Sequence, residues 1–363
     1  MSELQTKLSK IYELLDRYQL DGLYLARISS FAWATCGAAS YINTATTTGE
    51  AALFITRQAR YLITNNIEAP HYEIEEQLKA QGWDFQIRHW YEPDETLAHL
   101  SKGLKVGTDI CLPGLTDLSA EITTLRGNLL PEEQARYREV SRCCAQAMEA
   151  AIRLVRPGMS EYEIAGLLAR EAYDRDMLPI VDLIATDERI SGFRHPLPAH
   201  DKKLEKYAML ILCGRRYGLV TSVTRLVHFG PLPEVLKKKQ AANLQVDARV
   251  ISATRPGATV KDMFATIQQA YESAGYPGEW QRHHQGGPAG YEPRELLATP
   301  SANFRVQAGQ AYAWNPTITG VKVEDTILIT DSGFEIMTEM PGWPMTDIEV
   351  DGQTIRRPLI LEI

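Results

Sequence analysis

The sequence has no long apolar run and no recognisable targeting segment. No stretch approaches the roughly 18 consecutive apolar residues of a membrane-spanning helix. The polar start, Met1 to Lys7, lacks the basic and apolar regions of a secretory signal, so we expect no export by that route. Low-complexity tracts are also missing. These absences favour a globular protein over a membrane, secreted or disordered one.

Cysteine is scarce, and its spacing carries no metal or redox motif. The five cysteines include no C-x-x-C pair and no cysteine–histidine spacing typical of a zinc site. Their odd number argues against a disulfide framework. We therefore expect reduced thiols and a cytoplasmic location.

Composition is ordinary, with a moderate excess of acidic residues. Of the 363 residues, 44% are hydrophobic and 23% are charged, and the net charge is −8. This length suggests two or three domains and a core large enough to fold without a structural metal. The acidic balance argues against nucleic acid or an anionic membrane as the main partner. The expected ligand is a small molecule or a short peptide.

Helix-like and strand-like segments alternate up to about residue 125. Apolar residues recur at helical spacing in 3–18, and Asp21-Gly22 then turns the chain into a strand-like run. Further segments are strand-like at 51–55, 59–64 and 85–89 and helix-like at 70–81 and 94–102. This alternation predicts a small α/β domain. A linker at 127–131 gives the expected domains 1–128 and 129–363.

The second part of the chain contains an internal sequence repeat. Arg156-Pro157-Gly158-Met159-Ser160 recurs as Arg255-Pro256-Gly257-Ala258-Thr259. Each copy follows a helical stretch and opens an amphipathic one, and the Ser160 and Thr259 hydroxyls can cap the second helix. The pattern predicts two similar halves with helices outside and strands inside, although it is also a frequent junction between helices.

Several motifs of this second part together resemble the pita-bread superfamily of methionine aminopeptidase, prolidase, aminopeptidase P and creatinase. The motifs are Leu204 to Gly214, Ser222-Val223-Thr224-Arg225, His283 to Gly290, Ala313 to Pro316 and Gly320 to Thr330. The resemblance covers residues 131–335 and extends more loosely to Ser30-Phe31-Ala32-Trp33. It implies an α+β protein: a C-terminal pita-bread domain with internal duplication after a smaller α/β domain of the creatinase and prolidase type.

The resemblance also implies five positions where metal-dependent members hold two metal ions. These positions carry Cys213 (or Ile211 if the alignment has no gap), Ser222, Gly287, Asn315 and Glu324. Only Glu324 is a carboxylate, whereas two adjacent divalent ions need several anionic ligands to offset their repulsion. We therefore expect no metal and no other cofactor. A single zinc ion near Cys213 and His284 is the alternative.

Creatinase is the metal-free member of this superfamily, and it supplies an expectation for the chemistry. Its catalytic histidine corresponds to His195, with His200 as the alternative, and Glu324 is the expected catalytic carboxylate. Thr224 and Asn315 stand where creatinase has glutamates, which argues against creatine as the substrate.

These comparisons yield a set of expected site residues and three hypotheses for function. Expected substrate-binding residues are Cys213, Ser222, Thr224, Arg225, His284 and Asn315. Arg225 could instead pair with a structural carboxylate, and His283 could replace His284 as the residue facing the cleft. The leading hypothesis is a metal-independent hydrolase of a C–N bond in a small guanidino, amidino or amide compound, acting as a homodimer. The alternatives are a non-catalytic peptide- or metabolite-binding protein and a residual Xaa-Pro peptidase.

Overall fold

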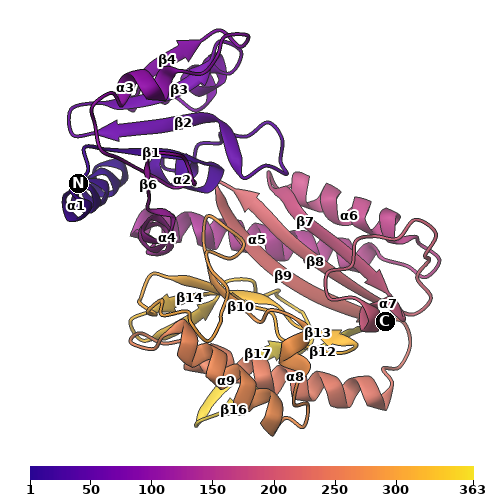
Figure 1. The fold of residues 1–363 in the computed structure, drawn as a ribbon. Helices are drawn as coiled ribbons and strands as arrows, with labels where there is room; N and C mark the ends of the chain where they lie inside the picture. Colours follow the sequence, from indigo (N-terminus) through magenta and orange to yellow (C-terminus); the bar gives the residue numbers. More distant parts are fainter. The chain divides into compact units, whose positions relative to one another are not determined.

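The computed structural model describes residues 1–363, which form two compact units (Figure 1). The first comprises Met1–Arg126 with Tyr217–Leu219, and the second comprises Gly127–Arg216 with Val220–Ile363. No helix combines the length and the apolar character needed to cross a membrane. All five cysteines are free thiols.

The first unit is a mixed six-stranded sheet flanked by short helices. The strand order is β4-β3-β2-β1-β5-β6. Its helices are α1 (Glu3–Tyr18), α2 (Ile28–Ala34), α3 (Thr96–Leu100) and α4 (Ser119–Gly127), with a π-helical turn at His71–Glu75. Its strands are β1 (Gly22–Arg27), β2 (Thr48–Thr56), β3 (Arg60–Asn65), β4 (Asp84–Arg88), β5 (Val106–Thr108) and β6 (Thr116–Asp117). The small α/β architecture that the alternation predicted is therefore present.

Helix α1 shows how local sequence sets an element of this unit. The Ser2 side chain accepts a hydrogen bond from the Gln5 amide, and the Gln5 side chain accepts one from the Ser2 amide, which satisfies two donors at the helix start. Ile11, Leu14 and Leu15 recur at helical spacing and are all buried. The helix therefore forms where its cap and its apolar stripe agree.

The second unit pairs long helices with two four-stranded sheets. The sheet orders are β18-β9-β8-β7 and β10-β11-β14-β15. The helices are α5 (Pro131–Leu154), α6 (Glu161–Tyr173), α7 (Arg189–Gly192), α8 (Glu234–Ala253) and α9 (Val260–Ser273), with a 3₁₀ turn at Glu279–Arg282. The strands are β7 (Leu178–Thr186), β8 (Tyr207–Arg216), β9 (Leu219–His228), β10 (Gly286–Ala289), β11 (Ala311–Trp314), β12 (Thr317–Ile318), β13 (Val321–Lys322), β14 (Asp325–Thr330), β15 (Gly333–Ile336), β16 (Met345–Val350), β17 (Gln353–Pro358) and β18 (Leu361–Glu362).

The internal sequence repeat corresponds to two similar helix pairs, α5–α6 and α8–α9. Ser160 and Thr259 each cap the second helix of their pair in a capping box, with Glu163 and Asp262 respectively. Ser160 also forms an isolated antiparallel bridge with Lys203, and Thr259 forms one with Arg305. The expected α+β fold with two related halves is confirmed.

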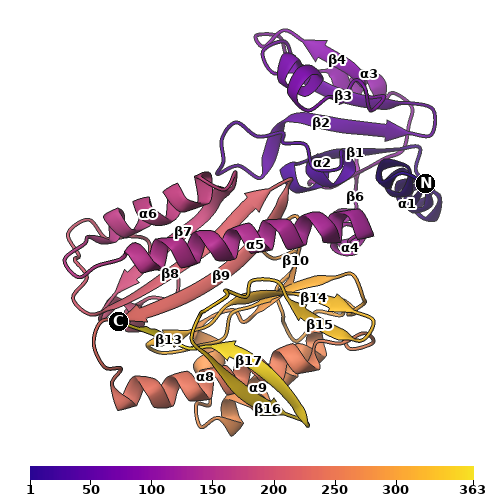
Figure 2. The same ribbon diagram turned by 180° about the vertical axis from the view of Figure 1, so that it is seen from behind.

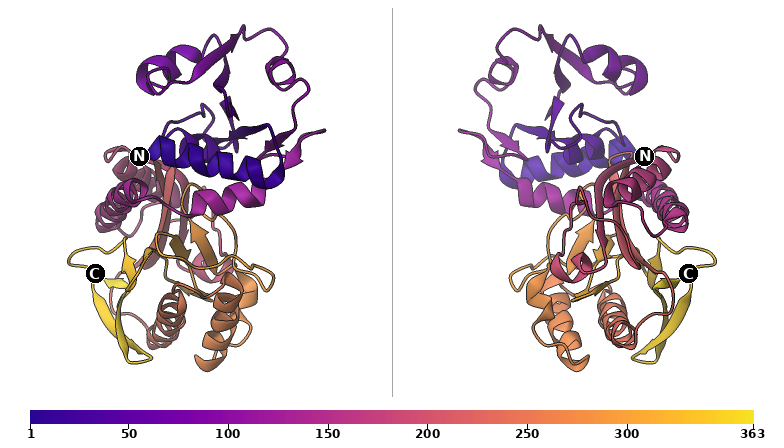
Figure 3. Two further views of the ribbon diagram at one scale, coloured as in Figure 1. Left: turned by 90° about the vertical axis from the view of Figure 1, so that its left-hand side faces the viewer. Right: turned by 90° about the vertical axis from the view of Figure 1, so that its right-hand side faces the viewer.

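Strand alternation decides which side chains of the β7–β9 sheet face the interior of this unit. Leu210 and Leu212 of β8 pack with residues of α5 and α6, which cover one face of the sheet (Figure 2). Met209 and Ile211 point the other way, into the core shared with α8 and α9. The hairpin β16–β17 lies beside α8 (Figure 3). Cys213 is two positions beyond Ile211 in β8, so its side chain also lies on this inward face.

Candidate active site

One pocket of the second unit, about 540 Å³ in volume, collects most of the expected site residues. Its lining includes His195, Cys213, His284, Asn315 and Glu324. Cys213 comes from β8, Asn315 directly follows β11, Glu324 directly precedes β14, and the two histidines come from loops. Segments that lie far apart in the sequence thus converge on one small-molecule-sized space.

Glu324 is the charged centre of this pocket, and the chain itself neutralises it. Arg294 Nη2 donates to its Oε1 at 2.7 Å, and Thr224 Oγ1 donates to its Oε2 at 2.6 Å. Lys322 Nζ lies 3.7 Å from Oε2. Burial raises the pKa of Glu324, but the charges of Lys322 and Arg294 outweigh it and bring the pKa down to about 2. The carboxylate is therefore ionised and already paired.

Arg294 links Glu324 to the hairpin formed by β8 and β9. Its Nη1 donates to Ser222 Oγ at 3.1 Å, and Ser222 Oγ lies 3.2 Å from Cys213 Sγ. Burial raises the pKa of the Cys213 thiol to about 11, so this thiol stays protonated near neutral pH. Ser222 and Cys213 therefore lie side by side as the resemblance implied, with a guanidinium next to them.

Three histidines form a second cluster, and two of them, His195 and His284, line the same pocket. His195 Nε2 lies 3.1 Å from His283 Nε2, and the ring of His284 stacks on that of His283 with centroids 4.5 Å apart. Burial lowers the pKa of all three, and the nearby Lys322 lowers that of His195 and of His283 further. For His284 the pKa falls to about 4. The imidazoles are therefore neutral near pH 7 and can accept protons or bind a metal ion.

The residues present do not fit the two metal ions of metal-dependent pita-bread members. Four of the five positions carry a thiol, a hydroxyl, a glycine and an amide, and the fifth, Glu324, is paired with Arg294 and Lys322. A divalent cation beside Glu324 would face two positive charges and too few anionic ligands. One nitrogen atom from each of the three histidines, all within 4.8 Å of one another, makes up the donor set that could hold a single transition-metal ion.

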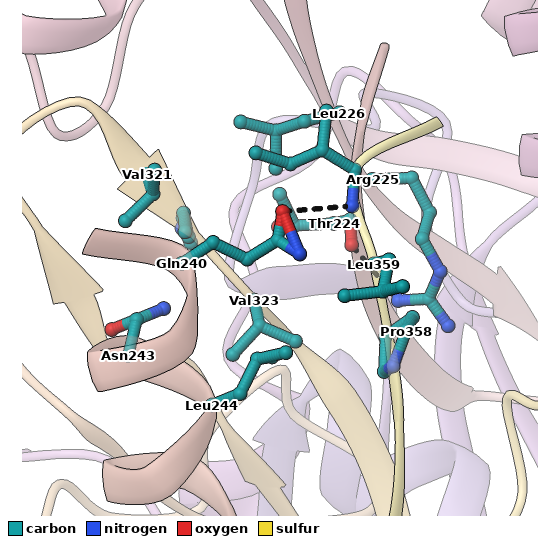
Figure 4. A pocket seen from close by; sticks show the side chains of 12 residues that line it. Thr224, Arg225, Leu226, Gln240, Asn243, Leu244, Val321, Val323, Pro358 and Leu359 are labelled. Carbon is teal, nitrogen blue, oxygen red and sulfur yellow. Dashed lines mark hydrogen bonds between the residues drawn. The ribbon is translucent and has the colours of Figure 1, made fainter. Parts of the chain in front are cut away.

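Thr224 and Arg225 are placed differently from the other expected residues. Thr224 acts on the pocket through its hydrogen bond to Glu324. Arg225 pairs with Asp325 at 2.7 Å and does not line the pocket. Figure 4 shows its side chain at a separate cavity of about 20 Å³, beside Leu226 and Leu359, with room for about one water molecule. The structure therefore places Arg225 with the structural carboxylate that the sequence offered as its alternative partner.

Sequence reasoning missed Arg294 and Lys322 and ranked His283 below His284. Lys322 and Glu324 are two positions apart beside a strand, a spacing that places two side chains on one face and could have signalled the pair. Arg294 follows the glycine-rich motif by four positions and had no comparable signal. His200, the alternative to His195, stacks on Tyr162 instead of lining the pocket.

Comparison with known proteins places this architecture and pocket in a family. The model of metallopeptidase family M24 matches residues 135–331, and the chain belongs to this family of hydrolases. An Xaa-Pro dipeptidase of Pyrococcus horikoshii is 23% identical over 371 residues, covering 93% of this chain and 98% of that protein. An uncharacterized peptidase of Staphylococcus epidermidis is 24% identical, and the match spans 61% of this chain and 66% of that protein, just under two thirds of its length.

Solved structures confirm the pita-bread fold. The Xaa-Pro dipeptidase from Bacillus anthracis superposes with a TM-score of 0.78 at 18% identity, covering 99% of this chain and 100% of that one. The prolidase from Pyrococcus horikoshii gives a TM-score of 0.75 at 21% identity, covering 92% and 98%. At these identities the likeness establishes the fold alone.

Proposed function

We propose that this chain is a metal-independent hydrolase that cleaves a C–N bond in a small guanidino, amidino or amide compound. Membership of a hydrolase family supports the reaction class. The observation that carries the metal-free part is the contact of Arg294 and Lys322 with Glu324, the one carboxylate left among the family's ligand positions. Two side-chain cations thus provide positive charge in the pocket.

In this proposal His195 is the general acid–base group. It lines the pocket, it is neutral near pH 7, and its Nε2 is within hydrogen-bonding distance of His283. Its ring takes a proton from water as the water oxygen attacks the substrate carbon. The same proton then goes to the leaving nitrogen as the C–N bond breaks, so that the ring returns to its starting state.

Glu324 and its cations support this step by position and charge. Glu324 holds Arg294 and Lys322 at the pocket, where their positive charge can stabilise the carbonyl oxygen of an amide substrate, which becomes negative in the transition state. Cys213, Ser222 and Thr224 keep this group in place through their own contacts. Arg225, also expected to bind substrate, contributes from a distance by anchoring the backbone carbonyl of Glu324 at 3.1 Å.

His284 and Asn315 are the proposed direct substrate contacts. Both line the pocket, and His284 Nδ1 and Asn315 Oδ1 are buried without a hydrogen-bond partner. Buried polar atoms without partners are costly, so a ligand that satisfies them gains affinity. The amide oxygen accepts and the imidazole can donate or accept, which suits a ligand that carries both N–H and C=O groups.

A turnover screen tests the proposal. Guanidino, amidino and amide compounds and Xaa-Pro dipeptides would be incubated with the protein, with and without a chelator, and product amines measured. The proposal expects hydrolysis of at least one C–N bond at a rate that the chelator does not lower. Turnover of Xaa-Pro dipeptides that requires added metal would instead support a residual peptidase, the activity named in the dipeptidase relative.

A non-catalytic role is the second candidate. Glu324 is paired with two cations and the Cys213 thiol is protonated, so neither is a ready nucleophile, which also suits a protein that only holds a peptide or metabolite. Binding of a ligand without turnover, unaffected by His195→Ala, would favour this role over the hydrolase.

We also propose that the chain acts as a homodimer, as its resemblance to prolidase and creatinase implies. The prolidase from Pyrococcus horikoshii and the Xaa-Pro dipeptidase from Bacillus anthracis share the fold over nearly the whole chain. Light scattering at micromolar concentration should give twice the chain mass of 40.7 kDa. A single species at the monomer mass would contradict this assembly.

A further inference from the structure

The three histidines at the pocket have a geometry that hydrogen bonding alone does not explain. Only one hydrogen bond joins them, between the Nε2 atoms of His195 and His283. Ring centroids of His195 lie 4.7 Å from His283 and 5.3 Å from His284. Nδ1 of His283 and Nδ1 of His284 are buried without partners. Three imidazoles therefore converge while most of their nitrogen atoms lack a partner within the protein.

The spacing of these nitrogen atoms suits one transition-metal ion. Zinc binds histidine nitrogen at about 2.0–2.1 Å in a tetrahedral arrangement, which separates neighbouring ligand atoms by roughly 3.3 Å. The 3.1 Å between the Nε2 atoms of His195 and His283 is close to this value, and one nitrogen of His284 lies within 4.8 Å of both. Small side-chain rotations complete the set. His195 is exposed, which leaves an entry path and a fourth position for water.

We propose that His195, His283 and His284 form a mononuclear zinc site, distinct from the family's ligand positions, and that zinc bound there inhibits the enzyme. The inhibitory part rests on the proposed function: zinc occupies the nitrogen lone pair with which His195 takes a proton from water. Zinc and catalysis compete for one ring, so the metal is a regulator and not a cofactor. Zinc is favoured over magnesium or calcium because all three donors are imidazole nitrogens.

The surroundings set the expected affinity. Metal-binding histidines usually donate their second ring N–H to a carboxylate or carbonyl, and such partners contribute 10- to 100-fold in affinity, as an order of magnitude. The second nitrogen of His283 has no such partner. Arg294 and Lys322 at the same pocket add a repulsive field that Glu324 only partly offsets. We therefore expect reversible zinc binding with a dissociation constant on the order of micromolar, far weaker than a structural zinc site.

Direct binding is the first test. Zinc chloride would be titrated into chelator-treated, full-length protein by calorimetry, and cobalt would be used as an optical probe. The expected result is one equivalent of zinc, and a cobalt spectrum of tetrahedral nitrogen and oxygen coordination without a thiolate charge-transfer band. A thiolate band that disappears in Cys213→Ser would move the ion to Cys213 and overturn the proposal. Absence of zinc binding at about 100 times a micromolar dissociation constant would overturn it as well.

Histidine variants locate the ion. His283→Ala and His284→Ala should each weaken zinc binding by roughly 10-fold or more, because each removes one of three ligands. His200→Ala removes an exposed histidine outside the cluster and is the matched control, expected to bind zinc like the wild type. Unchanged zinc affinity in His283→Ala and His284→Ala would overturn the site. Thermal melts without metal show whether each variant is folded.

The two proposals fail separately. The protein could bind zinc through the histidines and hydrolyse no compound. This result would contradict the proposed hydrolase and its inhibition, and it would support the metal site. Conversely, the protein could hydrolyse a substrate in a reaction that needs His195 and yet bind no zinc. This result would contradict the metal site and support the hydrolase. If both hold, zinc should lower turnover over the concentration range in which it binds, and a chelator should restore it. Zinc that binds at the histidines and leaves turnover unchanged would overturn inhibition.

Discussion

Glu324 and Asp325 are neighbours in the chain, yet they belong to two different charge clusters. Glu324 faces the pocket and contacts Arg294, Lys322 and Thr224. Asp325 faces the core: its Oδ1 accepts from Arg225 Nη2 at 2.7 Å and from Thr338 Oγ1 at 2.6 Å, and its Oδ2 accepts from Arg357. Adjacent residues of an extended segment point to opposite sides, so one step along the chain separates the two clusters.

The difference between the clusters lies in what surrounds them. Arg357 of the Asp325 cluster is fully buried and also contacts Asp247, so this cluster ties α8, β14 and β17 together. The Glu324 cluster borders a pocket lined by His195 and His284, and His283 contacts both of these rings. Buried ion pairs alone therefore do not mark a functional site; an adjoining pocket of ligand size, such as the one of about 540 Å³ beside Glu324, is the better sign.

The largest expected effect is a loss of catalysis when His195, in the pocket beside Glu324, is replaced. His195→Ala should lower kcat by roughly 10²–10⁴, the usual contribution of a positioned acid–base group, while KM changes much less. Because the unprotonated ring accepts the proton, wild-type activity should fall as the pH drops below the lowered pKa of His195. His200→Ala serves as the control and should be fully active. A substrate hydrolysed equally fast by His195→Ala would remove the proposed mechanism.

Disrupting the Asp325 cluster in the core should cause a large loss of stability. Asp325→Asn should lower the free energy of unfolding by about 3–5 kcal/mol, because Arg225 and Arg357 lose a buried counter-charge. Glu324→Gln should cost less, about 1–2 kcal/mol, because Lys322, whose pKa burial lowers, can release its proton once the carboxylate is gone, whereas the two arginines beside Asp325 stay charged. Urea unfolding measures both. Equal losses would mean that the Glu324 cluster is as structural as its neighbour.

The sequence was sufficient for the framework and for part of the pocket. Helical periodicity predicted α1, and the repeated motif with its capping hydroxyls at Ser160 and Thr259 predicted the two similar helix pairs, since these signals are local. Motif order predicted that Cys213 and Ser222 lie together. The domain limits 1–128 and 129–363 stay predictions.

Other features of the pocket depend on packing that no local pattern encodes. Arg294 reaches Ser222 across 72 positions of sequence, and nothing local shows this. Strand alternation suggested that either His283 or His284 faces the pocket, but their rings stack and both lie beside His195. Arg225 has carboxylates at 324 and 325 as candidate partners, and only the three-dimensional register selects Asp325.

Asp182 extends the comparison to a carboxylate that pairs with no cation. Its Oδ1 is buried without a partner, and burial raises the pKa of the carboxyl to about 7. It lies opposite Leu212, on the face of the sheet that α5 and α6 cover. Between the unfolded pKa near 3.8 and the folded value, the folded state binds more protons than the unfolded state. Stability from this group is therefore present at low pH and is lost as the pH rises towards 7.

Asp182→Asn should abolish this dependence. Relative to the wild type, the variant should gain about 1–3 kcal/mol of stability between pH 4 and pH 8, after allowing for partial solvent screening. Urea unfolding across this range measures the difference. Asp174→Asn, which removes an exposed carboxylate at the end of α6, is the control and should parallel the wild type. Parallel curves for Asp182→Asn and the wild type would show that the carboxyl is stabilised by a contact or by solvent.

The smallest expected effect comes from removing metal. Chelator treatment should leave the melting temperature and turnover unchanged, because Arg294 and Lys322 already provide the positive charge beside Glu324. A metal ion bound at 100 times its dissociation constant would contribute about 2.7 kcal/mol, so its loss would be visible in a melt. Elemental analysis of the purified protein should find no stoichiometric manganese, cobalt, iron or zinc, because the histidine site is expected to release zinc during purification. Two metal equivalents that disappear in Glu324→Gln would place a binuclear centre at the family's position. That result would contradict the interpretation that Arg294 and Lys322 replace the metal ions, since two divalent ions and these two side chains would place six positive charges around one carboxylate.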